Sequence, residues 1–346
     1  MGIKRRYGAL LGAFLSGFLL CNIAVAAEVE LNPSHPESYI VVKGDTLWDI
    51  SARFLKSPWR WPDIWQVNSQ IENPHLIFLG DEIELSFVDG KPQLSLKRGH
   101  KKLSPEVRKS SLESAIPVVP VSAIVTFLNT PRVMTLEEYE SAPYIVAFSD
   151  EHILGSAGFK AYVRSIEKDD QDGYNVIRQG EEYLDGGTGE KLGFESVFIA
   201  EGEILKTGDP ATIKLSKSTR EAVKGDRLLP AIEGIYVQQY FPRAPEREVD
   251  GHIIGVVDGV TQIGQYNIVV IDRGEEDGIK NGHVLRVDHR GELARDVVIG
   301  GGEEVRLPDE EAGTIMVFRV FKRVSYGLVM EAKRVMHRLD RVKTPE

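Results

Sequence analysis

The chain has 346 residues, of which 42% are hydrophobic and 27% charged, and its formal net charge is −10. This length and composition are typical of two or three folded domains and argue against a chain that is disordered throughout. The negative charge argues against a general nucleic-acid binder, because phosphate binding needs a clustered excess of Lys and Arg.

Residues 1–26 have the pattern of an export signal. Lys4, Arg5 and Arg6 precede the apolar run ALLGAFLSGFLLC, and the small residues Ala24-Val25-Ala26 follow it. We expect cleavage after Ala26, with Ala27 as second choice, and export to the periplasm. The apolar run is short for an uncleaved anchor, since a bilayer span needs about 20 apolar residues.

Cys21 is the single cysteine of the sequence. The residues Phe18-Leu19-Leu20 directly before it include no small residue, which argues against a lipid anchor at this position. Cleavage removes Cys21 and the three cations, so the net charge falls from −10 to −13. The mature chain then has neither a disulfide nor a thiol nucleophile, and its stability must come from packing.

Residues 38–87 carry a compact pattern of short elements. YIVV predicts a strand and KGD a turn, and TLWDISARFL predicts a helix because Leu47, Ile50 and Phe54 fall on one stripe. Thr46 and Asp49 have capping-box spacing. A second helix, PDIWQVNSQ, is predicted to begin at its proline, and ENPHLIFLGDEIELSF predicts a loop, a Gly-Asp turn and a closing strand. The predicted order is strand, helix, helix, strand.

The segments YIVVKGDTLWDIS, IWQVN and IENPHLIFLGDEIEL occur in an order and at a spacing that resemble a LysM module, the glycan-binding unit of many cell-wall proteins. The resemblance implies binding to the N-acetylated glycan strands of peptidoglycan in a shallow groove between two loops. Backbone N–H and C=O groups of these loops would pair with the N-acetyl amide, and a small apolar floor would hold its methyl group. The implied groove residues are Gly44, Asp45, Thr46 and Leu47 on one side and Asn73, Pro74, His75 and Leu76 on the other.

Each of these residues also has a structural interpretation. Asp45 and Thr46 can cap the first helix, and Asn73-Pro74 can shape the turn. The sequence leaves these two roles open for Thr46.

The four tryptophans lie within residues 48–65. A module this small, without disulfides, needs most of their surface buried to offset its conformational entropy. Trp61 and Trp65 are predicted to be core residues. Trp48 and Trp59 are predicted to be the two that are free to be partly exposed, so only these are worth testing as contacts, while the GDTL and NPHL loops on either side are expected to hold the sugar.

Residues 88–115 are predicted to be a basic flexible linker, because they hold seven Lys or Arg against three acids and few large apolar residues. The linker serves as a tether or is drawn weakly to the anionic wall. From residue 116 onward, short runs of Val, Ile, Tyr and Phe alternate with Gly-rich turns, and TLEEYES alone suggests a helix. We place two β-rich modules at residues 116–245 and 246–346, with the acidic insertion GGEEVRLPDEE as a mobile loop.

The expected fold class is therefore α+β: a small βααβ module followed by a mostly-β region of two small barrel-like modules. A fragment recurs in this region. AVKGDRLLP (222–230) and GIKNGHVLRV (278–287) share an aliphatic residue, a Gly-Asp or Gly-His turn and a strand, and MHRLDRV (336–342) is a degraded third copy. Glycine supplies the backbone angle that such a bend needs.

The sequence favours a non-enzymatic protein without metal or cofactor. The histidines form no HxH or HExxH motif, and the nearest pair, His283 and His289, flanks a predicted strand without a nearby acid. KDDQDG and LDGGTGEKLG are predicted to be hairpin turns, because the first fails the calcium-loop spacing and the second the phosphate-loop spacing. A chance carboxylate pair among the 52 acids leaves a wall-remodelling enzyme as the alternative.

The whole arrangement resembles the type IV pilus secretin-associated proteins of Gram-negative bacteria, whose C-terminal region is similar to that of a flagellar basal-body ring protein. The segments YNIVVIDRGEEDGIKNGHVLRV and GTIMVFRVFKRVSYGLVMEAKRVMHRLDRV carry this resemblance. It implies a periplasmic anchor that joins peptidoglycan to an outer-membrane secretin ring in multiple copies. A scaffold of another envelope machine, such as the flagellum, is a further alternative. The strip FRVFKRVSYGLVM is either core or a surface for the partner.

Overall fold

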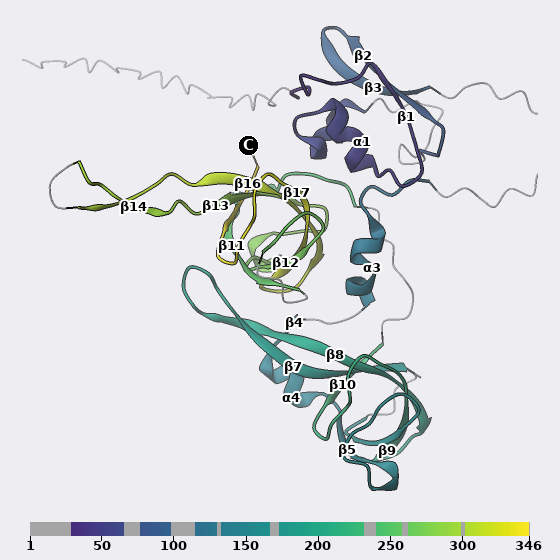
Figure 1. The fold of residues 1–346 in the computed structure, drawn as a ribbon. Coiled ribbons are helices and arrows are strands. Elements are labelled where there is room, and N and C mark those ends of the chain that lie inside the picture. The colour runs from purple at the N-terminus through teal and green to yellow at the C-terminus, as the bar shows by residue number, and fades with distance from the viewer. Residues whose placement is uncertain are drawn as a thin grey trace, which may run out of the picture.

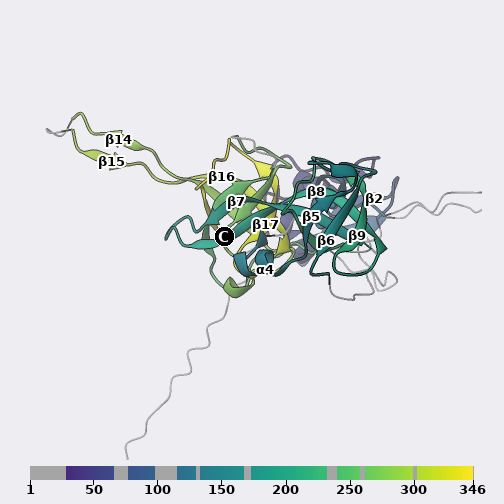
Figure 2. The ribbon, with the colours of Figure 1, turned by 90° about the horizontal axis from the view of Figure 1, so that it is seen from below.

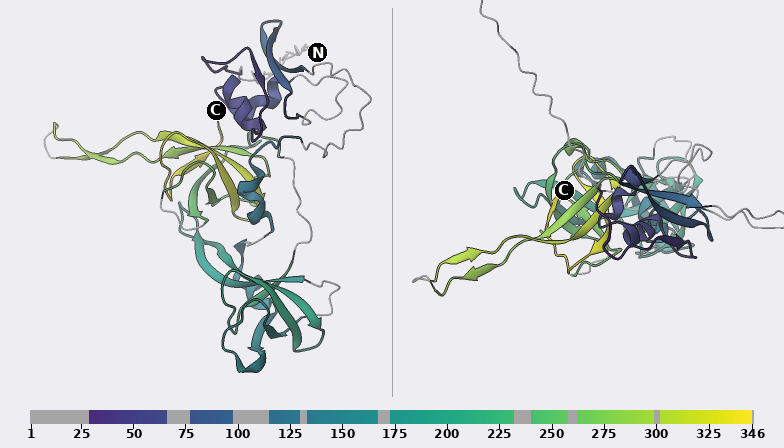
Figure 3. Two further views of the ribbon diagram at one scale, coloured as in Figure 1. Left: turned by 45° about the vertical axis from the view of Figure 1, so that its right-hand side comes forward. Right: turned by 90° about the horizontal axis from the view of Figure 1, so that it is seen from above.

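The computed structural model describes residues 29–65, 77–97, 115–129, 133–166, 173–231, 240–257, 262–298 and 302–345. A small α/β module comes first in the chain, a seven-stranded sheet second and a closed barrel last. The barrel nevertheless lies between the other two in space (Figures 1 and 3). The predicted signal peptide lies outside the described residues, and within them no helix is long and apolar enough to span a bilayer.

The first module contains a three-stranded antiparallel sheet in the order β1-β2-β3, with two short α-helices and one 3-10 turn packed on it. Its elements are β1 (Ser38–Ile40), α1 (Leu47–Phe54), η1 (Pro58–Arg60), α2 (Trp61–Ile64), β2 (Glu82–Val88) and β3 (Lys91–Lys97). The predicted strand, helix, helix, strand order is confirmed. The second helix is shorter than the predicted PDIWQVNSQ: it begins at Trp61 rather than at the proline and ends at Ile64, because Trp65 is already extended and bridges to Leu94. Residues 66–76 lie outside the structure's described ranges.

The strand β3 differs from the sequence prediction, which assigned residues 88–115 to a flexible linker. Asp89 and Gly90 both have positive φ angles, 52° and 78°, as a two-residue hairpin turn requires. The strand that follows alternates, and it places Leu94, which is 1% exposed, in the core of the module. The Asp-Gly pair was the signal for this hairpin, and the basic composition of the segment masked it.

The seven-stranded sheet has the order β4-β8-β7-β10-β5-β6-β9, and an additional pairing of β8 with β9 closes β5–β10 into a ring with β4 attached to β8. Its strands are β4 (Val133–Met134), β5 (Tyr144–Phe148), β6 (Lys160–Arg164), β7 (Gly173–Leu184), β8 (Lys191–Lys206), β9 (Ala211–Ser218) and β10 (Arg227–Pro230), with a 3-10 turn η2 (Ser149–Glu151). The predicted turn in LDGGTGEKLG joins β7 to β8, where the Asp185 carboxylate accepts the N–H groups of Gly187 and Thr188.

Two helices precede or flank this sheet. α4 (Leu136–Ser141) confirms the helix predicted from TLEEYES, and Thr135 and Glu138 form its capping box. α3 (Val121–Asn129) contradicts the prediction of β structure for this apolar, β-branched segment. Ile124 is fully buried within the cluster that also holds barrel residues, so tertiary packing overrides the local strand propensity here.

The last part is a closed barrel in the order β11-β12-β17-β16-β13-β18. Its strands are β11 (Asp250–Val256), β12 (Ile268–Ile271), β13 (Val284–His289), β16 (Glu310–Val320), β17 (Ser325–Ala332) and β18 (Arg341–Lys343), with a 3-10 turn η3 (Glu275–Asp277). The predicted α+β class is confirmed. The strip FRVFKRVSYGLVM lies on β16 and β17, where Phe318, Tyr326 and Leu328 are at most 2% exposed, so most of its large side chains are core.

The acidic insertion is not a loop throughout, as predicted. It supplies β15 (Glu304–Arg306), which pairs with β14 (Leu293–Arg295), and the beginning of β16. β14 and β15 form an arm that projects from the barrel (Figure 2). The arm carries exposed apolar side chains, among them Leu293 at 55% and Val297 at 85%.

The recurrent fragment is confirmed as one turn geometry. The third residue of each turn, Gly225, Gly282 or Leu339, has a positive φ angle between 73° and 92°. The side chain of the fourth residue then accepts the N–H of the first: Asp226 from Val223, His283 from Lys280 and Asp340 from His337. The same geometry occurs before α1, where Asp45 accepts the N–H of Val42, and before β2, where Asp81 accepts that of Phe78. In each of these turns, therefore, one polar side chain fixes the backbone just before a buried strand or helix begins.

The first module and the barrel share one hydrophobic cluster. Trp48 of α1 is 2% exposed and belongs to the cluster of the barrel residues Ile254, Ile268 and Tyr326. The hydroxyl of Tyr266 also lies 3.3 Å from the carboxylate of Asp49. The seven-stranded sheet joins the barrel through its β7–β8 turn, where Gly186 donates to Asp272.

Candidate glycan-binding site

The first wall of the expected groove is the turn between β1 and α1. Gly44 has a φ of 98°, and the Asp45 carboxylate accepts the N–H of Val42 at 2.8 Å and the hydroxyl of Tyr39 at 3.0 Å. Thr46 is the N-cap of α1, since its Oγ1 accepts the N–H of Asp49 at 3.1 Å and donates to the Asp49 carboxylate at 2.7 Å. The side chains of Asp45 and Thr46 therefore hold the turn, in which Gly44 is exposed.

The second wall is described only from Ile77 onward. Asn73, Pro74, His75 and Leu76 lie outside the described residues, so their predicted role stays a prediction. Leu79, 52% exposed, lies across from Gly44, Asp45 and Thr46 in one shallow cavity of about 360 Å³. Val42 contributes a second exposed aliphatic side chain to this cavity. Leu47 does not line it, because its side chain is buried in the core of the module.

The end of the predicted linker and the residues that follow it also line this cavity, which the sequence did not indicate. The lining residues of this segment are Ala115, Ile116, Pro117, Pro120 and Ser122. Three backbone hydrogen bonds hold the segment: Leu47 N–H to Pro117 C=O at 3.0 Å, Trp48 N–H to Val118 C=O at 3.1 Å, and Ile116 N–H to Ile77 C=O at 2.8 Å. The segment therefore contacts both walls of the groove.

The tryptophans do not form a sugar platform. Trp61 is 1% exposed, as predicted, and its ring meets the partly buried Trp65 edge-on with centroids 6.0 Å apart. The prediction that Trp48 is free to be partly exposed is wrong, because Trp48 points away from the core of its own module and is buried against the barrel. Trp59 is partly buried against the same cluster and lines a different cavity.

That second cavity, of about 460 Å³, lies between the first module and the barrel and contains several acids. Glu30 comes from the N-terminal segment, and Glu311 and Glu331 from β16 and β17. Burial raises the pKa of Glu331; the nearby charge of Lys333 partly offsets this rise, and that of Glu311 adds to it. Glu311 itself is ion-paired with Lys333 at 2.6 Å. The cavity thus brings two carboxyl groups of neighbouring strands together beside Lys333.

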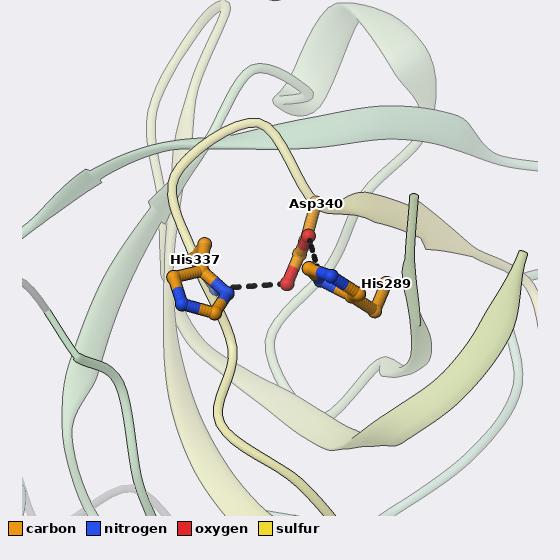
Figure 4. Close-up of side chains that lie close together, drawn as sticks. All are labelled: His289, His337 and Asp340. Carbon is orange, nitrogen blue, oxygen red and sulfur yellow. Dashed lines mark hydrogen bonds and ion pairs between the residues drawn. The ribbon is translucent and has the colours of Figure 1, made fainter. Parts of the chain in front are cut away.

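One cluster could offer ligand atoms to a metal ion among the described residues. His289, His337 and Asp340 each present one such atom within 4.8 Å of the others (Figure 4). The expectation that His289 has no nearby acid is wrong, because Asp340, 51 residues later, pairs with His289 Nδ1 at 2.9 Å. The other oxygen of Asp340 accepts the backbone N–H of His337 at 2.8 Å. Both oxygens thus have protein partners, as do those of Asp226 in the equivalent turn, which bind Arg178.

Residues 39–86 match the LysM domain family. This range includes both walls of the groove. The chain is also 37% identical over 62 residues to an uncharacterized protein, YqbP, of Bacillus subtilis (strain 168). That match covers 15% of this chain and 28% of the relative. LysM domains bind the N-acetylglucosamine of peptidoglycan and are binding rather than catalytic units, so the N-terminal module is a cell-wall binding module.

Proposed function

We propose that this protein is a non-enzymatic periplasmic adaptor whose LysM module binds peptidoglycan in the groove between the β1–α1 turn and the loop before β2. The shallow cavity carries this proposal, since it combines the exposed backbone of Gly44 with an aliphatic surface at Leu79 and Val42. An N-acetyl group needs both, because its amide forms hydrogen bonds and its methyl group prefers an apolar surface. Asn73, Pro74, His75 and Leu76 are proposed to complete the second wall.

A pull-down with purified peptidoglycan tests the groove. We compare two full-length variants that add the same charge to an exposed aliphatic residue of the same module. Leu79→Glu places a carboxylate in the cavity, and Ile40→Glu, at a residue 59% exposed, places one outside it. We expect Leu79→Glu to lose most binding and Ile40→Glu to retain it. Equal retention by both variants would remove the groove assignment.

The β-rich region is proposed to hold an outer-membrane secretin ring, as the resemblance to secretin-associated proteins implies. Many copies around a ring would turn a weak glycan site into a firm anchor, because each bound copy raises the effective concentration of the next. The projecting β14–β15 arm, with exposed Leu293 and Val297, is the described surface best suited to meet such a partner. Crosslinking in cells, followed by identification of the attached protein, tests this role; a flagellar protein in place of a secretin would favour the alternative scaffold.

A wall-remodelling enzyme is the second candidate, and the cavity with Glu311 and Glu331 favours it. Glycoside hydrolysis uses a pair of carboxyl groups, and these two line one cavity. Release of muropeptides from peptidoglycan by the purified protein, lost in Glu331→Gln, would support this function. A flat time course would remove it.

A further inference from the structure

We infer that the segment 115–118 is a built-in occupant of the LysM groove, which a glycan must displace in order to bind. This inference rests on the proposed glycan function of the same groove, and it assigns to that site a competitor within the chain. Its basis is the three backbone hydrogen bonds that join the segment to both walls.

The hydrogen bonds on the first wall involve the first turn of α1. The first N–H groups of a helix have no partner within the helix and must be satisfied from outside. Thr46 Oγ1 accepts the N–H of Asp49, and the carbonyls of Pro117 and Val118 accept those of Leu47 and Trp48. The segment therefore takes the donors that the groove would otherwise present to a ligand.

The hydrogen bond on the second wall has the opposite direction. Ile116 donates its N–H to the carbonyl of Ile77 at 2.8 Å, next to the predicted groove residue Leu76. The segment thus offers amide carbonyls to one wall and an amide N–H to the other. An N-acetyl group carries the same pair, one C=O and one N–H, so the segment imitates the chemistry of the expected ligand.

The side chains show how the occupant is held and what it leaves open. Ile116 is partly buried against the LysM core, and Val118 packs against both the LysM core and the cluster shared with the barrel. Pro117 is exposed. The cavity that remains beside the segment is lined by Gly44, Thr46 and Leu79, so a sugar can enter there before the segment leaves.

Val119, the next residue, ties the occupant to the barrel. It is 1% exposed and belongs to the same cluster as Trp48. Displacing residues 116–118 would therefore remove contacts between the LysM module and the barrel. Glycan binding and the attachment of the LysM module to the β-rich region are therefore coupled. Binding of the glycan weakens the attachment, and the attachment weakens binding of the glycan.

Competition predicts that weakening the occupant tightens glycan binding. A protein whose binding-competent state is only partly populated binds with an apparent affinity reduced by that fraction. The test uses the full chain without its predicted signal peptide and a hexamer of N-acetylglucosamine, measured by calorimetry. Ile116→Asp together with Val118→Asp disfavours the docked segment, and we expect at least about tenfold tighter binding. Ile40→Asp together with Val88→Asp is the matched control, because it adds the same two carboxylates to exposed aliphatic residues of the LysM module that lie outside the cavity.

Hydrogen exchange on the unmodified chain gives a second measurement that does not depend on the variant folding. Saturation with the hexamer should speed the exchange of the Ile116 amide at least about tenfold, while the Ile50 amide, bonded to Thr46 within α1, stays unchanged. Slower exchange at Ile116, or equal or weaker binding by the double variant, would overturn the displacement. If neither the unmodified chain nor the variants bind the hexamer or peptidoglycan, the glycan function itself fails.

Discussion

Replacing Trp48 by alanine should separate the LysM module from the barrel without unfolding either. Trp48 is 2% exposed, and its hydrophobic cluster consists mainly of barrel residues, with Val119 and Ile124 among the others. A buried Trp removes about 200 Å² from water, worth about 5 kcal/mol at roughly 25 cal/mol per Å². Partial collapse of the site leaves an expected loss of about 3–5 kcal/mol. We expect this loss of stability to weaken the contact between the LysM module and the barrel.

Hydrogen exchange measured by mass spectrometry on the full chain shows in which regions the substitution reduces protection. In Trp48→Ala, exchange should increase in residues 115–119 and on β12, while the amides of α1 that bond within the helix stay protected. Trp61→Ala is the comparison, because Trp61 lies in the core of the LysM module itself. That variant should lose protection throughout residues 38–97 and leave the barrel unchanged. If Trp48→Ala behaved like Trp61→Ala, or changed nothing, the assignment of Trp48 to the contact would be refuted.

Three further predictions concern the barrel. Burial lowers the pKa of His283 from 6.5 to about 4, so below pH 6.5 the unfolded chain binds a proton at this residue and the folded chain does not. At about 1.36 kcal/mol per pH unit, acidification to pH 4 should lower the free energy of unfolding by up to about 3 kcal/mol. Urea titrations of His283→Asn should show a smaller loss of stability over the same pH range. Gly313→Ala should destabilise the barrel by about 3 kcal/mol or more, because its φ is 154° and a Cβ would lie 2.1 Å from the carbonyl oxygen of Glu331; an unchanged melting temperature would contradict this. Replacing residues 292–307 of the arm by a short turn should change the unfolding free energy by less than about 1 kcal/mol, because its side chains at Leu293 and Val297 are exposed; a larger loss in the same urea assay would show that the arm supports the barrel.

The turns were the most predictable part of this protein, because their chemistry is local. A residue with a positive φ, followed by a short acceptor side chain, is readable from Gly225-Asp226 or Gly282-His283 without knowledge of the fold. Even the degraded copy at Leu339-Asp340 keeps the geometry. The helix predicted from TLEEYES is likewise fixed locally, by the capping box that Thr135 and Glu138 form.

The errors came from segments whose neighbours are distant in the chain. Local propensity indicated β structure for residues 121–129, yet Ile124 is buried in a helix beside the barrel, and Arg319 donates to the carbonyl of Phe127 at 2.6 Å. The pairing of His289 with Asp340 joins residues that no spacing rule relates. In the groove, the sequence identified the β1–α1 turn but not its contact with residues 115–118, which lie about 70 residues away along the chain.

The sequence by itself determined the LysM module, the mostly-β character of the remainder and the turns that begin its strands, since each depends on contacts between near neighbours. Only the tertiary structure decided that Trp48 faces the barrel and that residues 115–118 fill part of the groove. Periodicity shows that a side chain will be buried but not what it will be buried against. Likewise, the free N–H groups at the start of α1 are evident from the sequence, whereas the carbonyls that satisfy them come from chain geometry alone.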